Sequence, residues 1–129
     1  MNTRTTSLLS IFTLIALSQV ALAGPTADAS KLKAERLALT NAKAKYAKAK
    51  AAYTKKPKDA KLKKAYIDAT VAYGTTTMNS GALTPREKYP AALNLYREAL
   101  KLDPKNKEAL NNSQMIAEIY KSMGRPIPK

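Results

Sequence analysis

Residues Tyr89–Asn106 read YPAALNLYREALKLDPKN, and this stretch decides the fold. Ala92, Tyr96 and Ala99 follow one another at spacings of four and three, so they share one face of a helix. Pro104 comes just after the last periodic residue, where a proline ends a helix rather than kinking it. The stretch therefore predicts a helix that presents two small residues and one ring to a neighbouring helix.

The segment that precedes this stretch predicts two further helices. The first is long, rich in lysine and alanine, and is expected from about Asp28 to Lys55. One apolar stripe of this helix repeats every seven residues, at Leu32, Leu39, Tyr46 and Tyr53. The second helix carries Leu62, Ala65, Tyr66, Ala69 and Tyr73. We expect it to fade around residues 74–77 and to give way to a loop over residues 78–84, where Asn, Ser and Gly act as breakers.

The start of the third helix is complicated by two prolines. The sequence Thr84-Pro85-Arg86-Glu87 reads as a capping box with proline at the first helical position. Pro90 would lack its hydrogen bond inside a helix begun there. We therefore expect one short turn over residues 85–88 and then a new helix, with Pro90 in its first turn, that runs to Leu102.

A fourth helix follows, and it completes an all-α chain. Its periodic positions are Ala109, Ser113, Ile116, Ala117, Tyr120 and Met123. Gly124 is expected to end it, and the prolines that follow predict an extended tail over residues 125–129. The predicted fold class is all-α and consists of antiparallel helix hairpins.

An internal repetition supports this arrangement. A shift of 47 residues brings Pro104-Lys105-Asn106 onto Pro57-Lys58-Asp59. The same shift places Ala99 on Ala52 and Tyr120 on Tyr73. The chain therefore contains two copies of a unit made of a helix end, a proline turn and the next helix.

These features resemble the tetratricopeptide repeat (TPR) family, in which small residues let a neighbouring helix approach while an aromatic side chain fills the gap. The residues assigned to repeat packing by the resemblance are Ala92, Tyr96, Ala99, Pro104, Tyr120, Ala52, Pro57 and Tyr73. The copies are longer than the usual period of about 34 residues, and the first has Lys45 and Ala49 in place of a small residue and an aromatic one. The resemblance implies a TPR-like stack of about one and a half repeats; a plain antiparallel helical bundle is the alternative.

The first residues have the layout of a secretory signal peptide. Arg4 gives a basic start, residues 8–17 form an apolar run, and Ala21-Leu22-Ala23 is an A-x-A cleavage site. A membrane anchor is the alternative, but the run is shorter than the roughly 20 residues needed to span a bilayer. We expect residues 1–23 to be removed near Ala23 on export to the periplasm or the outside of the cell, which leaves residues 24–129 as a single domain.

The chain is strongly basic, with a formal net charge of +14. Residues 24–80 hold 13 basic and 4 acidic residues. A cation of this strength associates with polyanions in a salt-dependent way. The candidate contact residues near the first proline turn are Lys55, Lys56, Lys58 and Lys61. A solvated face that keeps an alanine-rich helix soluble is the other interpretation, and lysines without the planar fork of arginine predict no specific nucleic acid recognition.

The side chains that most catalytic and metal sites use are missing from the sequence. There is no histidine and no cysteine, the nine acidic residues form no cluster, and four glycines form no phosphate-binding loop. We predict no catalytic, cofactor-binding or metal-binding residues. An enzyme would need a site made only of carboxylate, lysine and tyrosine.

The remaining hypotheses concern binding. The TPR resemblance implies a protein or peptide partner and a groove lined by the first helix of each repeat, on which Asn111, Asn112 and Met115 are candidate contacts; an exposed polar helix face is the alternative. We therefore expect an exported, non-enzymatic TPR-like module of the cell envelope or the extracellular space. The alternative is a polycationic envelope protein that binds cell-wall polymer, lipid headgroups or nucleic acid. The first helix caps the short stack, or a second subunit does so in a homo-oligomer.

Overall fold

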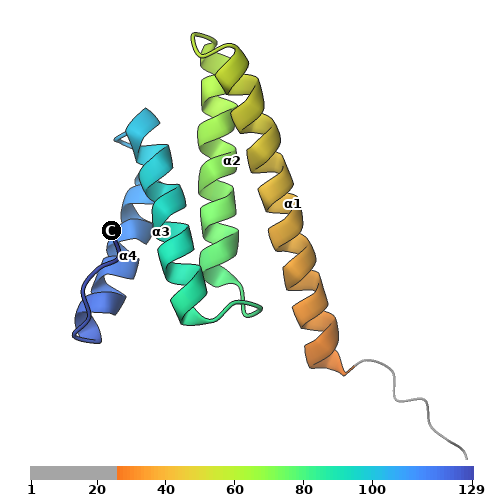
Figure 1. The fold of residues 1–129 in the computed structure, drawn as a ribbon, viewed down its shortest axis with the longest axis vertical. Coiled ribbons are helices and arrows are strands. Elements are labelled where there is room, and N and C mark those ends of the chain that lie inside the picture. Colours follow the sequence, from red (N-terminus) through yellow and green to blue (C-terminus); the bar gives the residue numbers. More distant parts are fainter. Residues whose placement is uncertain (1–25) are drawn as a thin grey trace, which may run out of the picture.

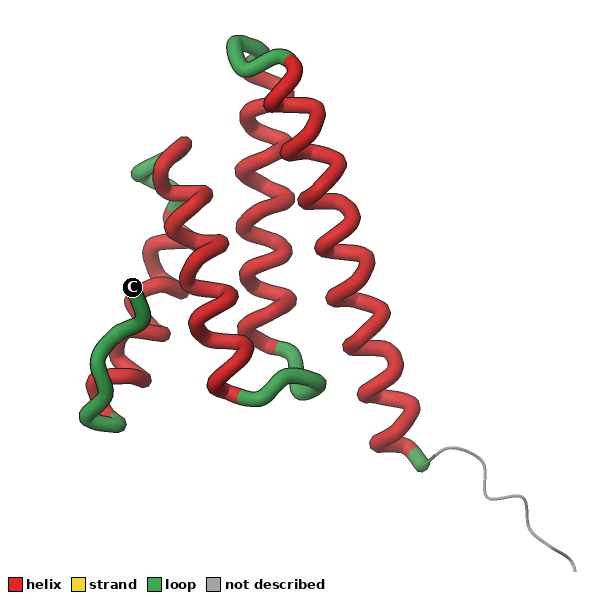
Figure 2. Tube along the Cα trace, in the orientation of Figure 1, coloured by secondary structure: helices red, strands yellow, loops and turns green. Residues whose placement is uncertain are grey.

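The computed structural model describes residues 26–129, which form four helices and no strand. The helices are α1 (Ala27–Lys55), α2 (Ala60–Asn79), α3 (Pro85–Leu102) and α4 (Lys107–Ser122). Consecutive helices run antiparallel and are joined by short turns (Figures 1 and 2). The all-α prediction is therefore confirmed. The expected signal peptide lies outside the described residues.

The hydrophobic core lies between α2, α3 and α4. Ala92, Tyr96 and Ala99 of α3 are completely buried, so the face predicted from residues 89–106 is the centre of this core. The residues packed around them are Ile67, Val71 and Met78 of α2, Leu93 of α3, and Ala109 and Ile116 of α4. Burying a large apolar side chain is worth roughly 1.5–3 kcal/mol, so this cluster is the main source of stability for α2–α4.

The outermost helix, α1, packs against α2 without burying any of its own residues completely. The half-buried residues of α1 include Leu39, Ala42, Tyr46, Ala49 and Tyr53. Three of these belong to the stripe predicted at seven-residue spacing, whereas Leu32, near the start of α1, is 41% exposed. α1 is therefore held by a narrow stripe and, as described below, by polar contacts.

The expectation that the second helix fades around residues 74–77 is wrong, because α2 continues to Asn79. Gly74 does not break the helix but makes room for a ring from α3. A Cβ atom at this position would lie 2.8 Å from Cε1 of Tyr96. The loop expected over residues 78–84 is correspondingly shorter and begins at Ser80.

The expected break after residues 85–88 is also wrong, because α3 runs without interruption through Pro90. The Glu87 carboxylate accepts hydrogen bonds from the Thr84 backbone N–H and hydroxyl at 2.9 and 2.7 Å, which fixes the first turn. Pro90 removes one intrahelical bond, to the carbonyl of Arg86. Arg86 is exposed, so water can solvate that carbonyl and the helix tolerates the proline.

The two proline turns that the sequence aligns, Lys56–Asp59 and Asp103–Asn106, have matching backbones. The first residue of each turn has φ of −139°, with ψ of 69° in one and 88° in the other. The last residue of each turn caps the next helix, Asp59 at φ −78° and ψ 112° and Asn106 at φ −63° and ψ 106°. The 47-residue repetition is thus present in the backbone, from the end of one helix to the start of the next.

Candidate binding groove

A groove runs along the exposed face of α2. Two adjoining hollows lie beside this face. The first, of about 440 Å³, lies between α2 and the α3–α4 turn, and the second, of about 550 Å³, lies between α2 and the start of α4. Asp68 and Asn106 line both hollows. A third hollow of about 320 Å³ lies on the α1 side and shares Ala72 and Thr76 with the second. α2 is therefore the floor of one open surface, called here the α2 groove, and α4 and α1 are its walls.

The α2 groove combines small apolar patches with exposed charged side chains of both signs. Its apolar lining includes Ile67, Val71 and Leu102. On the rim, the Lys64 ammonium pairs with the Asp68 carboxylate at 2.5 Å across one helical turn. The ammonium groups of Lys63 and Lys107 make no side-chain hydrogen bond within residues 26–129, so they are free to meet a ligand. The surface therefore combines apolar contact area with several polar groups, as peptide-binding sites do.

A hydrogen-bonded network supports the groove from below and joins three helices. The Asn112 amide of α4 donates to the Tyr96 hydroxyl of α3 at 3.0 Å and to Thr75 Oγ1 of α2 at 3.3 Å. The Thr75 hydroxyl donates to Glu108 Oε1 at 2.6 Å. Burial raises the pKa of the Tyr96 phenol, although its hydrogen bonds with Thr75 and Asn112 act in the opposite direction. The network fixes the α4 wall relative to the floor.

The three groove residues predicted on α4 lie in different environments. The Asn112 amide is used in this network, so its role in the structure is to hold helices together. Asn111 and Met115 are exposed, Met115 by 52%, and they follow Lys107 at four-residue steps on one face of α4. They extend the α4 wall beyond the hollows rather than lining them.

The other predicted residues separate into packing and surface positions. Besides the three buried residues of α3, the partly buried ones are Ala52, Tyr73 and Tyr120. Pro57 and Pro104 are exposed in their turns. Four exposed lysines surround the α1–α2 turn, outside the α2 groove: Lys55, Lys56, Lys58 and Lys61.

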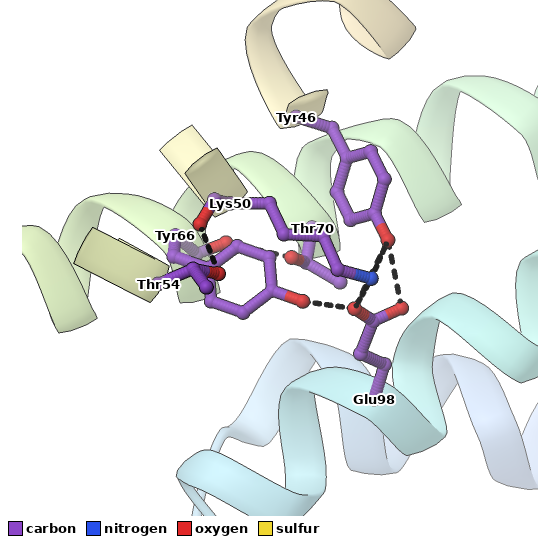
Figure 3. Close-up of polar contacts among 6 residues, drawn as sticks. All are labelled: Tyr46, Lys50, Thr54, Tyr66, Thr70 and Glu98. Atoms are coloured by element: carbon purple, nitrogen blue, oxygen red, sulfur yellow. Dashed lines mark hydrogen bonds and ion pairs between the residues drawn. The ribbon is translucent and has the colours of Figure 1, made fainter. Parts of the chain in front are cut away.

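A second cluster, which the sequence did not predict, joins α1, α2 and α3 around the Glu98 carboxylate (Figure 3). Tyr46 of α1 donates to both carboxylate oxygens at 3.0 Å, and Tyr66 of α2 donates to Oε1. The Lys50 ammonium lies 2.9 Å from the same oxygen. These four residues, called here the Glu98 clamp, connect α1 to α3 across α2.

Tyrosine rings pack around the clamp on the α1–α2 side. The ring of Tyr46 lies 6.0 Å from that of Tyr66 and 5.6 Å from that of Tyr73, and Tyr53 stacks on Tyr66 at 5.4 Å. The Lys50 ammonium lies 5.2 Å from the centre of the Tyr46 ring. These four tyrosines are thus packing residues between α1 and α2.

The clamp shifts the pKa values of Glu98, Tyr66 and Lys50 in directions that keep these groups in their bonded forms near neutral pH. Burial alone would raise the pKa of the Glu98 carboxyl, but hydrogen bonds from Tyr66, Lys50 and Tyr46 and the charge of Lys50 outweigh it and hold the pKa below its ordinary value. Burial, with the bond to Glu98, raises the pKa of the Tyr66 phenol. The hydrogen bonds to Tyr46 and Glu98 raise the pKa of the Lys50 ammonium.

The sequence carried a signal for the tyrosines of the clamp but none for the carboxylate. Tyr46 and Tyr66 stand in periodic apolar stripes, which predicted that they face other helices. Glu98 follows Tyr96 by two residues and so lies off the predicted core face of its helix. The Glu98 carboxylate contacts Tyr46 and Lys50 of α1 only because α1, α2 and α3 pack together in the fold.

Comparison with known proteins identifies no relative: no protein-family model, curated protein or solved structure matches the chain. Within residues 26–129, no three His, Cys, Asp or Glu side chains gather as a metal-binding group. The helices in this range also lack the combination of length and apolar character needed to cross a membrane. The groove and the clamp are therefore interpreted from their own chemistry.

Proposed function

We propose that this chain is an exported, non-enzymatic, TPR-like helical module that binds a segment of another protein in the α2 groove. The observation that carries the proposal is the open surface along α2, where apolar and charged side chains lie between two helical walls. The layout of residues 1–23 supports export. The matched proline turns and the small-aromatic-small face of α3 support a TPR-like relationship between the two halves.

The dimensions of the groove favour an extended peptide. Its lining runs along α2 from Ala60 to Thr76, which is about 24 Å at 1.5 Å per residue. An extended chain rises about 3.3 Å per residue, so the groove accommodates roughly seven residues. A partner segment that carries both acidic and basic side chains fits best, because the lining holds the carboxylates of Asp103 and Glu108 as well as the free ammonium groups of Lys63 and Lys107.

The test is site-specific crosslinking in an envelope extract, with a photoreactive residue placed at Thr76 inside the groove. A second variant of the chain carries the same photoreactive residue at the exposed position Ala47 of α1 and reports contacts outside the groove. We expect one partner to crosslink saturably from position 76 and not from position 47, in 0.3 M salt. No saturable partner at this salt concentration would overturn the proposal.

A matched pair of substitutions then assigns the contact to the groove. Ala72→Arg places a long side chain over the floor at an exposed position, so the fold is expected to persist. Ala44→Arg adds the same charge at an exposed position of α1 outside the hollows. Crosslinking from position 76 should disappear with Ala72→Arg and persist with Ala44→Arg; equal loss would indicate that charge, rather than the groove, governs binding.

A further inference from the structure

The end of the α1–α2 hairpin carries an unusual concentration of unpaired positive charge. We define the lysine tip as four exposed residues: Lys55, Lys56, Lys58 and Lys61. Within residues 26–129, none of these ammonium groups is paired with a carboxylate. The one acidic residue among them, Asp59, directs Oδ1 at the backbone N–H groups of Lys61 and Leu62, at 2.9 and 3.1 Å. Its carboxylate therefore caps α2 and does not neutralise the lysines through ion pairs.

The lysine tip projects from the molecule. Figure 1 shows the α1–α2 turn standing beyond the end of α3, so a flat surface can approach it without meeting the rest of the fold. The four exposed lysines occupy the end of α1, the turn itself and the first turn of α2. The large exposed apolar side chains lie elsewhere, at Leu32, Leu37, Leu110, Met115, Met123 and Ile127. Contact at the tip is therefore electrostatic and involves no inserted apolar side chain.

We propose that the lysine tip docks end-on against an anionic phospholipid surface. Because the α1–α2 turn projects beyond the end of α3, a plane of phosphate headgroups can approach its exposed lysines without meeting the rest of the fold (Figure 1). Lysine suits this role because its ammonium is a compact point charge that needs no fixed partner geometry. The inference does not rest on the α2 groove, whose lining begins beside the tip at Ala60 and runs away from it along α2 to Thr76.

Each lysine near an anionic membrane increases the binding constant about fivefold, so removing four of them weakens binding by several hundredfold. The measurement is cosedimentation of the purified protein with vesicles of phosphatidylglycerol and phosphatidylcholine in a 3:7 ratio. Vesicles of phosphatidylcholine alone are the uncharged reference. Binding should be strong at 0.05 M salt and absent at 0.5 M, because screening shortens the reach of exposed charges.

Two quadruple variants of equal net charge test the location. The first replaces the four tip lysines with glutamine, and the second replaces four exposed lysines elsewhere with glutamine, at Lys31, Lys43, Lys101 and Lys121. Circular dichroism verifies that both remain folded. We expect the first to lose several hundredfold in affinity and the second less than tenfold. Equal losses would overturn the proposal in favour of diffuse attraction by net charge, and binding to soluble polyphosphate without binding to vesicles would overturn it in favour of a polymer ligand.

Discussion

Replacing Glu98 with glutamine should loosen α1 from the rest of the fold. A hydrogen bond to a charged group contributes about 1.5–3 kcal/mol, and the carboxylate accepts from Tyr46 and Tyr66. The ion pair with Lys50 adds only about 0–1 kcal/mol, because the Lys50 side chain is 49% exposed. Glutamine keeps one acceptor oxygen but places an amide donor against the remaining partners. We expect the free energy of unfolding to fall by about 2 kcal/mol, which lowers the melting temperature by roughly 8–16 °C.

Urea denaturation followed by circular dichroism measures the total loss, and amide hydrogen exchange locates it. Because α1 buries none of its residues completely, its amides should lose more protection than those of α3 and α4. Glu118→Gln is the matched control, since Glu118 is exposed and its side chain has no hydrogen-bonding partner within residues 26–129. The control should remain within about 0.5 kcal/mol of the unmodified protein.

The reasoning fails if Glu98→Gln behaves like the control, or if protection is lost equally along the whole chain. Combining Glu98→Gln with Tyr46→Phe separates direct coupling from a general effect. Residues in one hydrogen-bond network interact by about 0.5–3 kcal/mol in such a cycle. Strict additivity of the two losses would mean that the clamp does not connect α1 to α3.

Three further predictions follow from the packing and the clamp. Gly74→Ala should lower stability by about 1 kcal/mol in urea denaturation, because the strain of about 1–3 kcal/mol against the buried Tyr96 ring exceeds the helix gain of about 1 kcal/mol; increased stability would contradict the close contact. Pro90→Ala should raise stability by about 1–3 kcal/mol by restoring a hydrogen bond and removing a clash inside a helix, whereas a loss would indicate that the helix does break there. Stability measured against pH should fall as the pH drops below the ordinary Glu pKa of about 4.3, because the unfolded chain then binds a proton more readily than Glu98 does in the fold, and again above about pH 10, because Tyr66 ionises more readily in the unfolded chain; no loss on either side would contradict the clamp.

Much of the fold could be predicted because its signals are local. The small-aromatic-small face of α3 lies at helical spacing, and its three residues are the centre of the core. The seven-residue stripe on α1 correctly indicated the face that meets α2. The proline turns fixed two helix boundaries, because each is followed by an Asp or Asn that caps the next helix.

Two predictions from the sequence, at Gly74 and Pro90, were wrong because they considered only neighbouring residues in the chain. Gly74 looks like a breaker from its neighbours, and only the Tyr96 ring from α3 explains why a residue without Cβ stands inside a helix. Pro90 looks like a helix start in the sequence. In the structure α3 begins five residues before it, at Pro85, where the contacts between Glu87 and Thr84 cap the first turn. In both cases tertiary packing and capping outweighed the local propensity that the prediction used.

The candidate sites were predictable to different degrees for the same reason. Lysines in a turn remain exposed in almost any fold, so the lysine tip could be located from the sequence. The groove depends on which helices flank α2, and Asn112 was expected to face a ligand but donates to Tyr96 instead. An amide on a helix face looks the same in sequence whether it meets a partner protein or another helix of its own chain.

The clamp also explains how a helix with little buried surface can flank the open α2 groove. α1 buries none of its residues completely and is held by half-buried residues and by the carboxylate cluster around Glu98. We expect α1 to open more easily than α2, α3 or α4, because its opening exposes no fully buried residue of its own. A ligand that touches both α1 and α2 across the groove would bind only while α1 is docked, and so would stabilise it by mass action. Weakening the clamp should therefore reduce affinity for a ligand that spans both walls even though Glu98 lies outside the groove.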